Sequence, residues 1–128
     1  AALGHRATLD GVPAPLRARA RPAALRRIVG NLVGNALRYG GAARVALHAD
    51  ADGTVEVWVD DDGPGIPPEQ LARAFEPWVR LDDAGHPRAG HGLGLAIARE
   101  LAERDGATLT LENRPEGGLR ARLRLPTA

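Results

Sequence analysis

The chain has 128 residues, of which 44% are hydrophobic and 26% charged, and its net charge of +1 predicts one soluble globular domain of ordinary composition. It contains no cysteine, which excludes a disulfide framework, a zinc site built on thiolates and a cysteine nucleophile. All 17 basic residues are arginine, so the lysine of a phosphate-binding P-loop is missing as well.

The N-terminal part of the chain is predicted to hold short strands followed by one long helix. The stretches 5–11 and 16–20 are typical of two modest strands with a proline-containing loop between them. Apolar residues then recur at helical spacing until the pair Gly40-Gly41, which predicts a helix over 22–39.

The middle of the chain alternates apolar and polar residues over 45–49 and again over 55–59, with a turn between them. This pattern predicts an antiparallel hairpin. The segment 61–68 is rich in aspartate, glycine and proline and is predicted to be a loop, which leads into a short helix near 68–75.

The C-terminal part is predicted to contain a long loop, a second helix and a final hairpin. The segment 76–90 has little periodicity, and loops of that length in compact domains usually serve a function. A helix follows and ends before Gly106, and two alternating segments then flank the turn 115–118. Hairpin strands interleaved with a few helices indicate an α+β fold with the helices on one face of one sheet.

Asn31 and Asn35 lie four residues apart, so both project from one side of the first predicted helix, next to its apolar stripe. Asparagine is unfavourable in mid-helix because its side chain competes for backbone groups. One interpretation is a pair of polar residues at the edge of a solvated face. The other is a metal site, since a carboxamide oxygen is a hard, neutral ligand that suits Mg²⁺ bound to nucleotide phosphates.

Asp61 precedes two glycines, Gly63 and Gly65, that are separated by a single residue. Taken alone, this pattern is most often just a turn. Glycine also permits the close approach of a planar ligand, and a carboxylate in a pocket can accept a hydrogen bond from an exocyclic amine. The segment is therefore also a candidate base-binding loop.

Gly90, Gly92 and Gly94 open the second long helix. Free backbone N–H groups at a helix N-terminus form an anion site, and residues without side chains let a phosphate approach. A Rossmann fingerprint is not supported, because the glycines do not sit in a βαβ unit and no acidic residue closes a strand about 20 residues later.

The segment 75–80 carries one phenylalanine and one tryptophan at the start of the long predicted loop. Phe75 is a candidate hydrophobic anchor that ties this loop to the core. Arg80 is a candidate phosphate ligand, because a guanidinium on a mobile loop can close over a phosphate.

In their order and spacing these segments resemble the ATP-binding catalytic domain of two-component sensor histidine kinases. That family is one branch of the superfamily of gyrase, heat-shock chaperone and mismatch-repair ATPases. Residues 31–39 resemble its N box, 61–65 the G1 box, 75–80 the F box and 90–94 the G2 box. The resemblance covers residues 5–126 and implies a two-layer, Bergerat-type α/β sandwich. Such a fold has a mixed, mostly antiparallel sheet of about five strands, covered on one face by about three helices.

The resemblance implies a role for each matching residue. Asp61 would bond the adenine amine, Tyr39 would pack on or near the base, and Asn35 would ligate Mg²⁺. Arg38 and Arg80 would contact phosphate. At one position the chain departs from the family: His91 stands where members more often have threonine, serine or alanine. The residues implied to be catalytic are Asn31, Asn35, Arg38 and Arg80. Those implied to bind nucleotide are Asn35, Arg38, Tyr39, Asp61, Gly63, Gly65, Ile66, Phe75, Gly90, His91, Gly92, Leu93 and Gly94.

The resemblance also indicates which reaction the domain supports, hydrolysis of ATP or transfer of its γ-phosphate. Hydrolysing members carry a glutamate four residues before the Mg²⁺ asparagine, where it activates water. Here that residue is Asn31, which is not a base at neutral pH. We therefore expect the domain to hold the γ-phosphate of ATP until a histidine is presented in line.

The expected acceptor is a histidine in a dimerisation domain upstream of Ala1, because none of the four histidines lies in a His-Glu or His-Asp helix context and the chain starts without methionine. The expected parent is a homodimeric, inner-membrane sensor kinase whose cytoplasmic domain this is, with a response regulator as indirect partner. Scattered arginines argue against nucleic acid as a partner. Two alternatives stay open: a serine kinase of the anti-sigma factor type, and a degenerate ATP-binding module kept for regulation.

Overall fold

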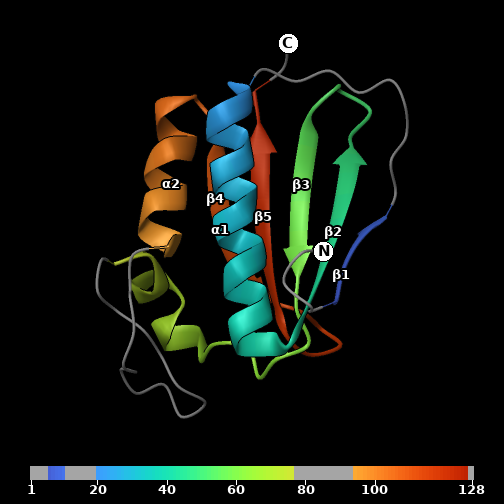
Figure 1. Ribbon diagram of the computed structural model, residues 1–128, viewed down its shortest axis with the longest axis vertical. Helices are drawn as coiled ribbons and strands as arrows, with labels where there is room; N and C mark the ends of the chain where they lie inside the picture. Colours follow the sequence, from blue (N-terminus) through green and yellow to red (C-terminus); the bar gives the residue numbers. More distant parts are fainter. Residues whose placement is uncertain (1–5, 11–19, 77–93, 127–128) are drawn as a thin grey trace.

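The computed structural model describes residues 6–10, 20–76 and 94–126. They form one five-stranded sheet in the order β1-β2-β3-β5-β4, with both α-helices on the same face (Figure 1). The strands are β1 (Arg6–Asp10), β2 (Ala42–Ala49), β3 (Val55–Asp60), β4 (Thr108–Asn113) and β5 (Leu119–Leu125). The helices are α1 (Pro22–Gly40) and α2 (Gly94–Arg104), with two 3₁₀ segments, η1 (Pro68–Gln70) and η2 (Ala72–Phe75). The predicted mixed two-layer α/β sandwich is confirmed.

The strands at the centre of the sheet show why the alternating pattern predicted them correctly. In β3, Val55, Val57 and Val59 are buried, and Val57 pairs with Leu123 of the antiparallel β5. Because successive strand residues point to opposite faces, these apolar side chains all lie on the face covered by the helices. Strand β1 is the one described strand that pairs in parallel, with β2.

Helix α1 buries one stripe of apolar residues, Ile28, Leu32, Ala36 and Leu37, against the sheet. It ends at Gly41, whose φ of 71° is left-handed and whose N–H donates to the Leu37 carbonyl at 3.1 Å. A glycine at this position closes the helix without a steric penalty. The predicted helix over 22–39 is therefore confirmed to within one residue.

Helix α2 packs closely beside α1 because its buried residues are small. Ala98 and Ala102, one turn apart, are both 0% exposed, and Leu123 of β5 is also 0% exposed. Small side chains on one helix let the two helices and the sheet approach closely. The helix ends before Gly106, as its sequence predicts.

The opposite face of the sheet is charged. Trp58 of β3 stacks on His48 with ring centroids 3.7 Å apart, and the Arg120 guanidinium lies 4.0 Å from the Trp58 ring. Arg122 pairs with both Glu56 and Glu112. These arginines stack on an aromatic ring and pair with carboxylates on the face of the sheet opposite the two α-helices. Within the described residues, no helix is long and apolar enough to span a bilayer.

Three predicted elements differ from the structure or fall outside it. The short helix near 68–75 is two 3₁₀ segments, because its hydrogen bonds join residues three apart, as from Gln70 N to Pro67 O. Ala20 is not in a strand, and the rest of the predicted strand 16–20 lies outside the described residues. The long loop predicted at 76–90 also lies outside them, except for Glu76.

Candidate nucleotide-binding site

The C-terminal half of α1 and the loop 61–66 that follows β3 meet in backbone contact. A Cβ added at Gly40 would lie 2.5 Å from the Cβ of Asp61, and one added at Gly63 would lie 2.7 Å from the Tyr39 carbonyl oxygen. Both distances are shorter than real contacts allow, so only glycine fits at either position. The N box and the G1 box of the sequence are thus brought together.

Asn31 connects α1 to the start of α2. Its Nδ2 donates to the carbonyl of Gly94 at 3.3 Å, across 63 residues of sequence. The contact brings the last glycine of the G2 box beside the N box. The predicted residues Arg80, Gly90, His91, Gly92 and Leu93 lie outside the described residues.

Asp61 is the most enclosed polar group of the site, with 4% of its surface exposed. Its Oδ1 accepts two backbone hydrogen bonds, from the N–H of Gly63 at 2.9 Å and from that of Leu119 at 3.1 Å. Its Oδ2 accepts no hydrogen bond from the part of the chain that the structure describes. One oxygen therefore fixes the carboxylate, while the other has no donor among the described residues.

Burial raises the pKa of Asp61, and the hydrogen bonds from Gly63 and Leu119 oppose that shift. Desolvation penalises the charged form of a carboxyl group, whereas N–H donors favour it. Carboxyl groups whose pKa is raised by burial are common at functional sites. A raised pKa means that burial disfavours the charged form of Asp61 relative to the neutral form.

The neighbours of Asp61 are neutralised by arginines, and Asp61 itself is not. Arg120 holds Asp60 through two hydrogen bonds of 2.9 and 3.0 Å, and Arg44 holds Asp62 through two of 2.9 and 2.6 Å. Such paired contacts fix both the position and the orientation of a carboxylate. Of the three consecutive aspartates, only Asp61 forms no ion pair with an arginine among the described residues.

The hydrogen bonds from Arg44 lower the pKa of Asp62 to about 2. A carboxyl group with a lowered pKa contributes stability above its unfolded pKa of about 4, and that contribution is lost as the pH falls toward 2. We expect an NMR titration of the Asp62 carboxyl to show its midpoint near 2. In Arg44→Ala the midpoint should move up toward the ordinary value, and the same midpoint in both proteins would contradict the pairing.

The remaining described residues of the predicted site differ in their surroundings. Asn35 is half-buried, and its carboxamide has no hydrogen-bond partner among the described residues. Arg38 is exposed in the last turn of α1 and forms no ion pair with any described residue. Tyr39 is half-buried, and Ile66 closes the loop that begins at Asp61.

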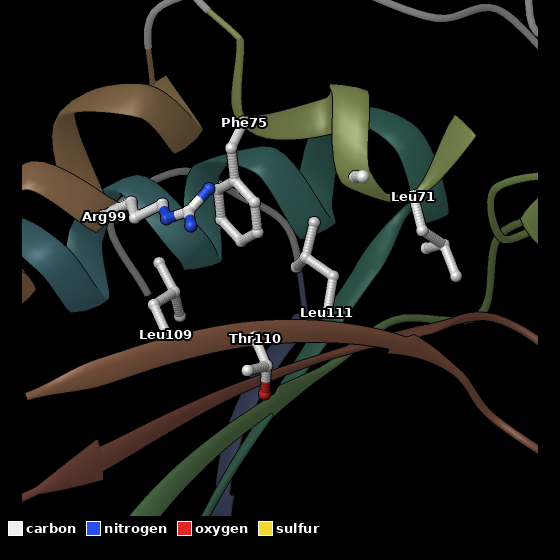
Figure 2. Close-up of a pocket in the computed structure, with 7 residues that line it drawn as sticks. Leu71, Phe75, Arg99, Leu109, Thr110 and Leu111 are labelled. Carbon is white, nitrogen blue, oxygen red and sulfur yellow. The ribbon is translucent and has the colours of Figure 1, made fainter. Parts of the chain in front are cut away.

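Phe75 is placed apart from these residues. It lies in a groove of about 270 Å³ between η2, α2 and β4, with the Arg99 guanidinium 4.8 Å from its ring centroid (Figure 2). None of the residues that line this groove belongs to α1 or to the loop 61–66. The groove supports the interpretation of Phe75 as a hydrophobic anchor more than as a nucleotide ligand. Its lining residues are Leu71, Ala72, Phe75, Arg99, Leu109, Thr110 and Leu111.

Two contacts to the loop 61–66 come from residues that the sequence patterns did not single out. Asn113, the last residue of β4, forms two hydrogen bonds with the backbone of Ile66. Arg114 donates to the carbonyl of Asp61 at 2.8 Å. Both precede a Pro-Glu-Gly-Gly turn, and the only local signal they carry is that of a hairpin end.

Comparison with known proteins identifies the class. The model of the family described as "Histidine kinase-, DNA gyrase B-, and HSP90-like ATPase" matches residues 20–128. The sandwich, with its buried aspartate beside the glycine end of α1, fits that match. The chain belongs to this ATPase family.

Similar proteins identify the branch. Sensor histidine kinase GtrS of Pseudomonas aeruginosa is 51% identical over 106 residues, which cover 83% of this chain and 22% of that protein. Signal transduction histidine-protein kinase AfsQ2 of Streptomyces coelicolor is 42% identical over 131 residues, which cover 98% of this chain and 24% of that protein. The domain is an ATP-binding catalytic domain of the histidine kinase type, and it spans about a quarter of the length of these relatives.

Solved structures agree. Full-length ShkA in complex with AMPPNP superposes with a TM-score of 0.80 at 30% identity, covering 98% of this chain and 26% of that one. The ATP-binding domain of PrrB from Mycobacterium tuberculosis superposes with a TM-score of 0.72 at 32% identity, covering 97% of this chain and 81% of that one. The likeness thus extends over both layers of the sandwich.

Proposed function

We propose that this domain binds Mg²⁺-ATP between α1, the loop 61–66 and the start of α2, and presents the γ-phosphate to a histidine in a two-component sensor kinase. The observation that carries the proposal is the Asp61 carboxylate, which is buried, is fixed through Oδ1 and accepts no hydrogen bond at Oδ2 from any described residue. A fixed, charged acceptor suits the exocyclic amine of adenine, and such a bond contributes roughly 1.5–3 kcal/mol.

Asn35 fits a role in holding magnesium. Its half-buried carboxamide has no hydrogen-bond partner among the described residues, so its oxygen is available as a hard, neutral ligand. The described residues contain no cluster of three or more histidine, cysteine, aspartate or glutamate side chains that could hold the ion by itself. Phosphate oxygens and water would supply the other ligands, as Mg²⁺ prefers. When bound, Mg²⁺ neutralises charge on the phosphates.

The other residues of α1 favour phosphate holding over hydrolysis. Arg38 is exposed and forms no ion pair with any described residue, so its guanidinium is available to a phosphate. Asn31 stands where a hydrolytic base would be needed, and its amide is engaged with the Gly94 carbonyl. A side chain that cannot accept a proton does not activate water, which leaves positioning of the γ-phosphate as the role of the site.

The partners follow from this function. The acceptor would be a histidine of a dimerisation domain in the same homodimeric kinase, and a response regulator would take the phosphoryl group from that histidine. The domain would work in the cytoplasm as part of an inner-membrane sensor. Adding a sensor-kinase dimerisation domain in trans, together with γ-labelled ATP, tests the transfer: label on its histidine supports the proposal, and label on serine contradicts it.

Binding itself is tested by thermal unfolding with and without Mg²⁺-ATP. A ligand at a hundred times its Kd stabilises the folded state by about 2.7 kcal/mol, which for a domain of this size raises the unfolding midpoint by roughly 10 °C. We expect that shift with Mg²⁺-ATP and a smaller one with ATP and EDTA. An unchanged midpoint at millimolar Mg²⁺-ATP would contradict the proposed function.

A further inference from the structure

The backbone of Ile66 is held by one side chain from a distant strand. Asn113 Oδ1 accepts the Ile66 N–H at 2.9 Å, and Asn113 Nδ2 donates to the Ile66 carbonyl at 2.7 Å. The side chain thereby satisfies both backbone groups of Ile66, as a neighbouring strand would. Two bonds in opposite directions fix the place and the orientation of this end of the loop 61–66.

Gly65 makes room for that contact. Its φ is 75°, and a Cβ added there would lie 2.5 Å from Asn113 Oδ1. Any other residue would meet both a backbone penalty and a clash with the Asn113 side chain. The second glycine of the G1 box therefore belongs to the same arrangement as Asn113.

Arg114 holds the other end of the loop. Its side chain is 10% exposed, and its Nη1 donates to the Asp61 carbonyl at 2.8 Å. The guanidinium also lies 3.5 Å from Asp60 Oδ2 and 3.4 Å from Asp62 Oδ1. It therefore contacts three consecutive residues and leaves the Asp61 carboxylate untouched.

We propose that Asn113 and Arg114 are positioning residues that set the base specificity of the nucleotide site. This inference rests on the proposed binding of ATP. Asn113 and Arg114 are adjacent at the end of β4 and hold the two ends of the loop 61–66. They therefore fix the distance between the Asp61 carboxylate and the backbone of Gly65 and Ile66. At that distance the Asp61 carboxylate accepts a hydrogen bond from the 6-amino group of adenine. A 6-oxo purine would instead place its own acceptor oxygen against the carboxylate. A site whose buried polar group is left unpaired by the wrong ligand discriminates strongly.

The experiment compares Mg²⁺-ATP with Mg²⁺-ITP, which carries a 6-oxo group, by calorimetric titration. We expect the wild type to prefer ATP at least about tenfold. Asn113→Ala, Asn113→Asp and Arg114→Lys should each reduce the ATP/ITP affinity ratio at least about fivefold, since the loss of one or two hydrogen bonds loosens the loop. Asn113→Asp keeps the acceptor and the shape but loses the donor to Ile66, so it tests the contact if Asn113→Ala folds poorly.

Thr108→Ala is the matched control, because the Thr108 side chain is exposed on the same strand and makes no hydrogen bond with any described residue. It should keep the wild-type ratio. A purely structural defect lowers the fraction of competent protein, and thus the stoichiometry, without changing the ratio. A wild-type ratio in folded Asn113→Asp and Arg114→Lys would overturn the inference. Failure of the wild type to bind Mg²⁺-ATP would instead overturn the proposed function.

Discussion

Gly40→Ala is expected to lower the free energy of unfolding by about 2 kcal/mol and to weaken Mg²⁺-ATP binding at least about tenfold. The added Cβ would lie 2.5 Å from the Cβ and 2.7 Å from the Cγ of Asp61. Asp61 cannot move aside freely, because Gly63, Leu119 and Arg114 all hold it by hydrogen bonds. Relief of the clash must therefore displace either the end of α1 or the carboxylate that we propose receives the base.

Gly30→Ala is the matched control, since it makes the same change in the same helix. A Cβ at Gly30 meets nothing within 4 Å. Alanine is favoured over glycine in a helix interior, so this variant should gain up to about 1 kcal/mol and bind nucleotide normally. Urea denaturation and calorimetric titration of both variants measure the contrast. Equal stabilities would show that α1 and Asp61 are not in the described contact.

Gly40 and its neighbour Gly41 show how far the sequence predicts this fold. Gly40-Gly41 correctly predicts the end of α1, because helix termination is a local property. Only Gly41, with its left-handed φ of 71°, ends the helix, whereas Gly40 leaves space for a side chain 21 positions later. The need for that space comes from tertiary packing, which no local pattern records.

Segment length explains why the alternating strands were predicted correctly and the 3₁₀ segments η1 and η2 were not. In a half-buried strand, apolar and polar residues alternate over six or more positions, as in Leu119–Leu125. The segment 68–75 is too short for its sequence to distinguish an α-helix from two 3₁₀ turns.

The candidate site divides in a similar way. The sequence singles out Asp61 as a candidate because the loop 61–66 carries its aspartate and glycines contiguously. Asn113 and Arg114 are not singled out, since they reach Ile66 and Asp61 across 47 and 53 residues from what reads as an ordinary hairpin end. Residues that bind a ligand can be found by motif, whereas residues that position them depend on which strands become neighbours, here β3 and β5 with β4 beyond.

Asp61→Asn is expected to lower the affinity for Mg²⁺-ATP by about ten- to a hundredfold and to raise the unfolding midpoint. A carboxamide that keeps its oxygen toward Gly63 and Leu119 presents an NH₂ donor to the adenine amine, which is also a donor. If the carboxamide flips, those two backbone bonds are lost. Either orientation weakens the site.

The gain in stability follows from the raised pKa of Asp61. A carboxyl group whose pKa is higher in the folded state costs stability at neutral pH, and the cost disappears as the pH falls through that pKa. The midpoint of Asp61→Asn should therefore exceed that of the wild type at pH 7, and the difference should shrink in acid. Thermal unfolding from pH 7 to 4 and nucleotide titration at pH 7 measure the two effects. A variant that is less stable at pH 7, or that binds Mg²⁺-ATP as the wild type does, would show that the buried carboxylate is a structural acceptor and not the residue that receives the base.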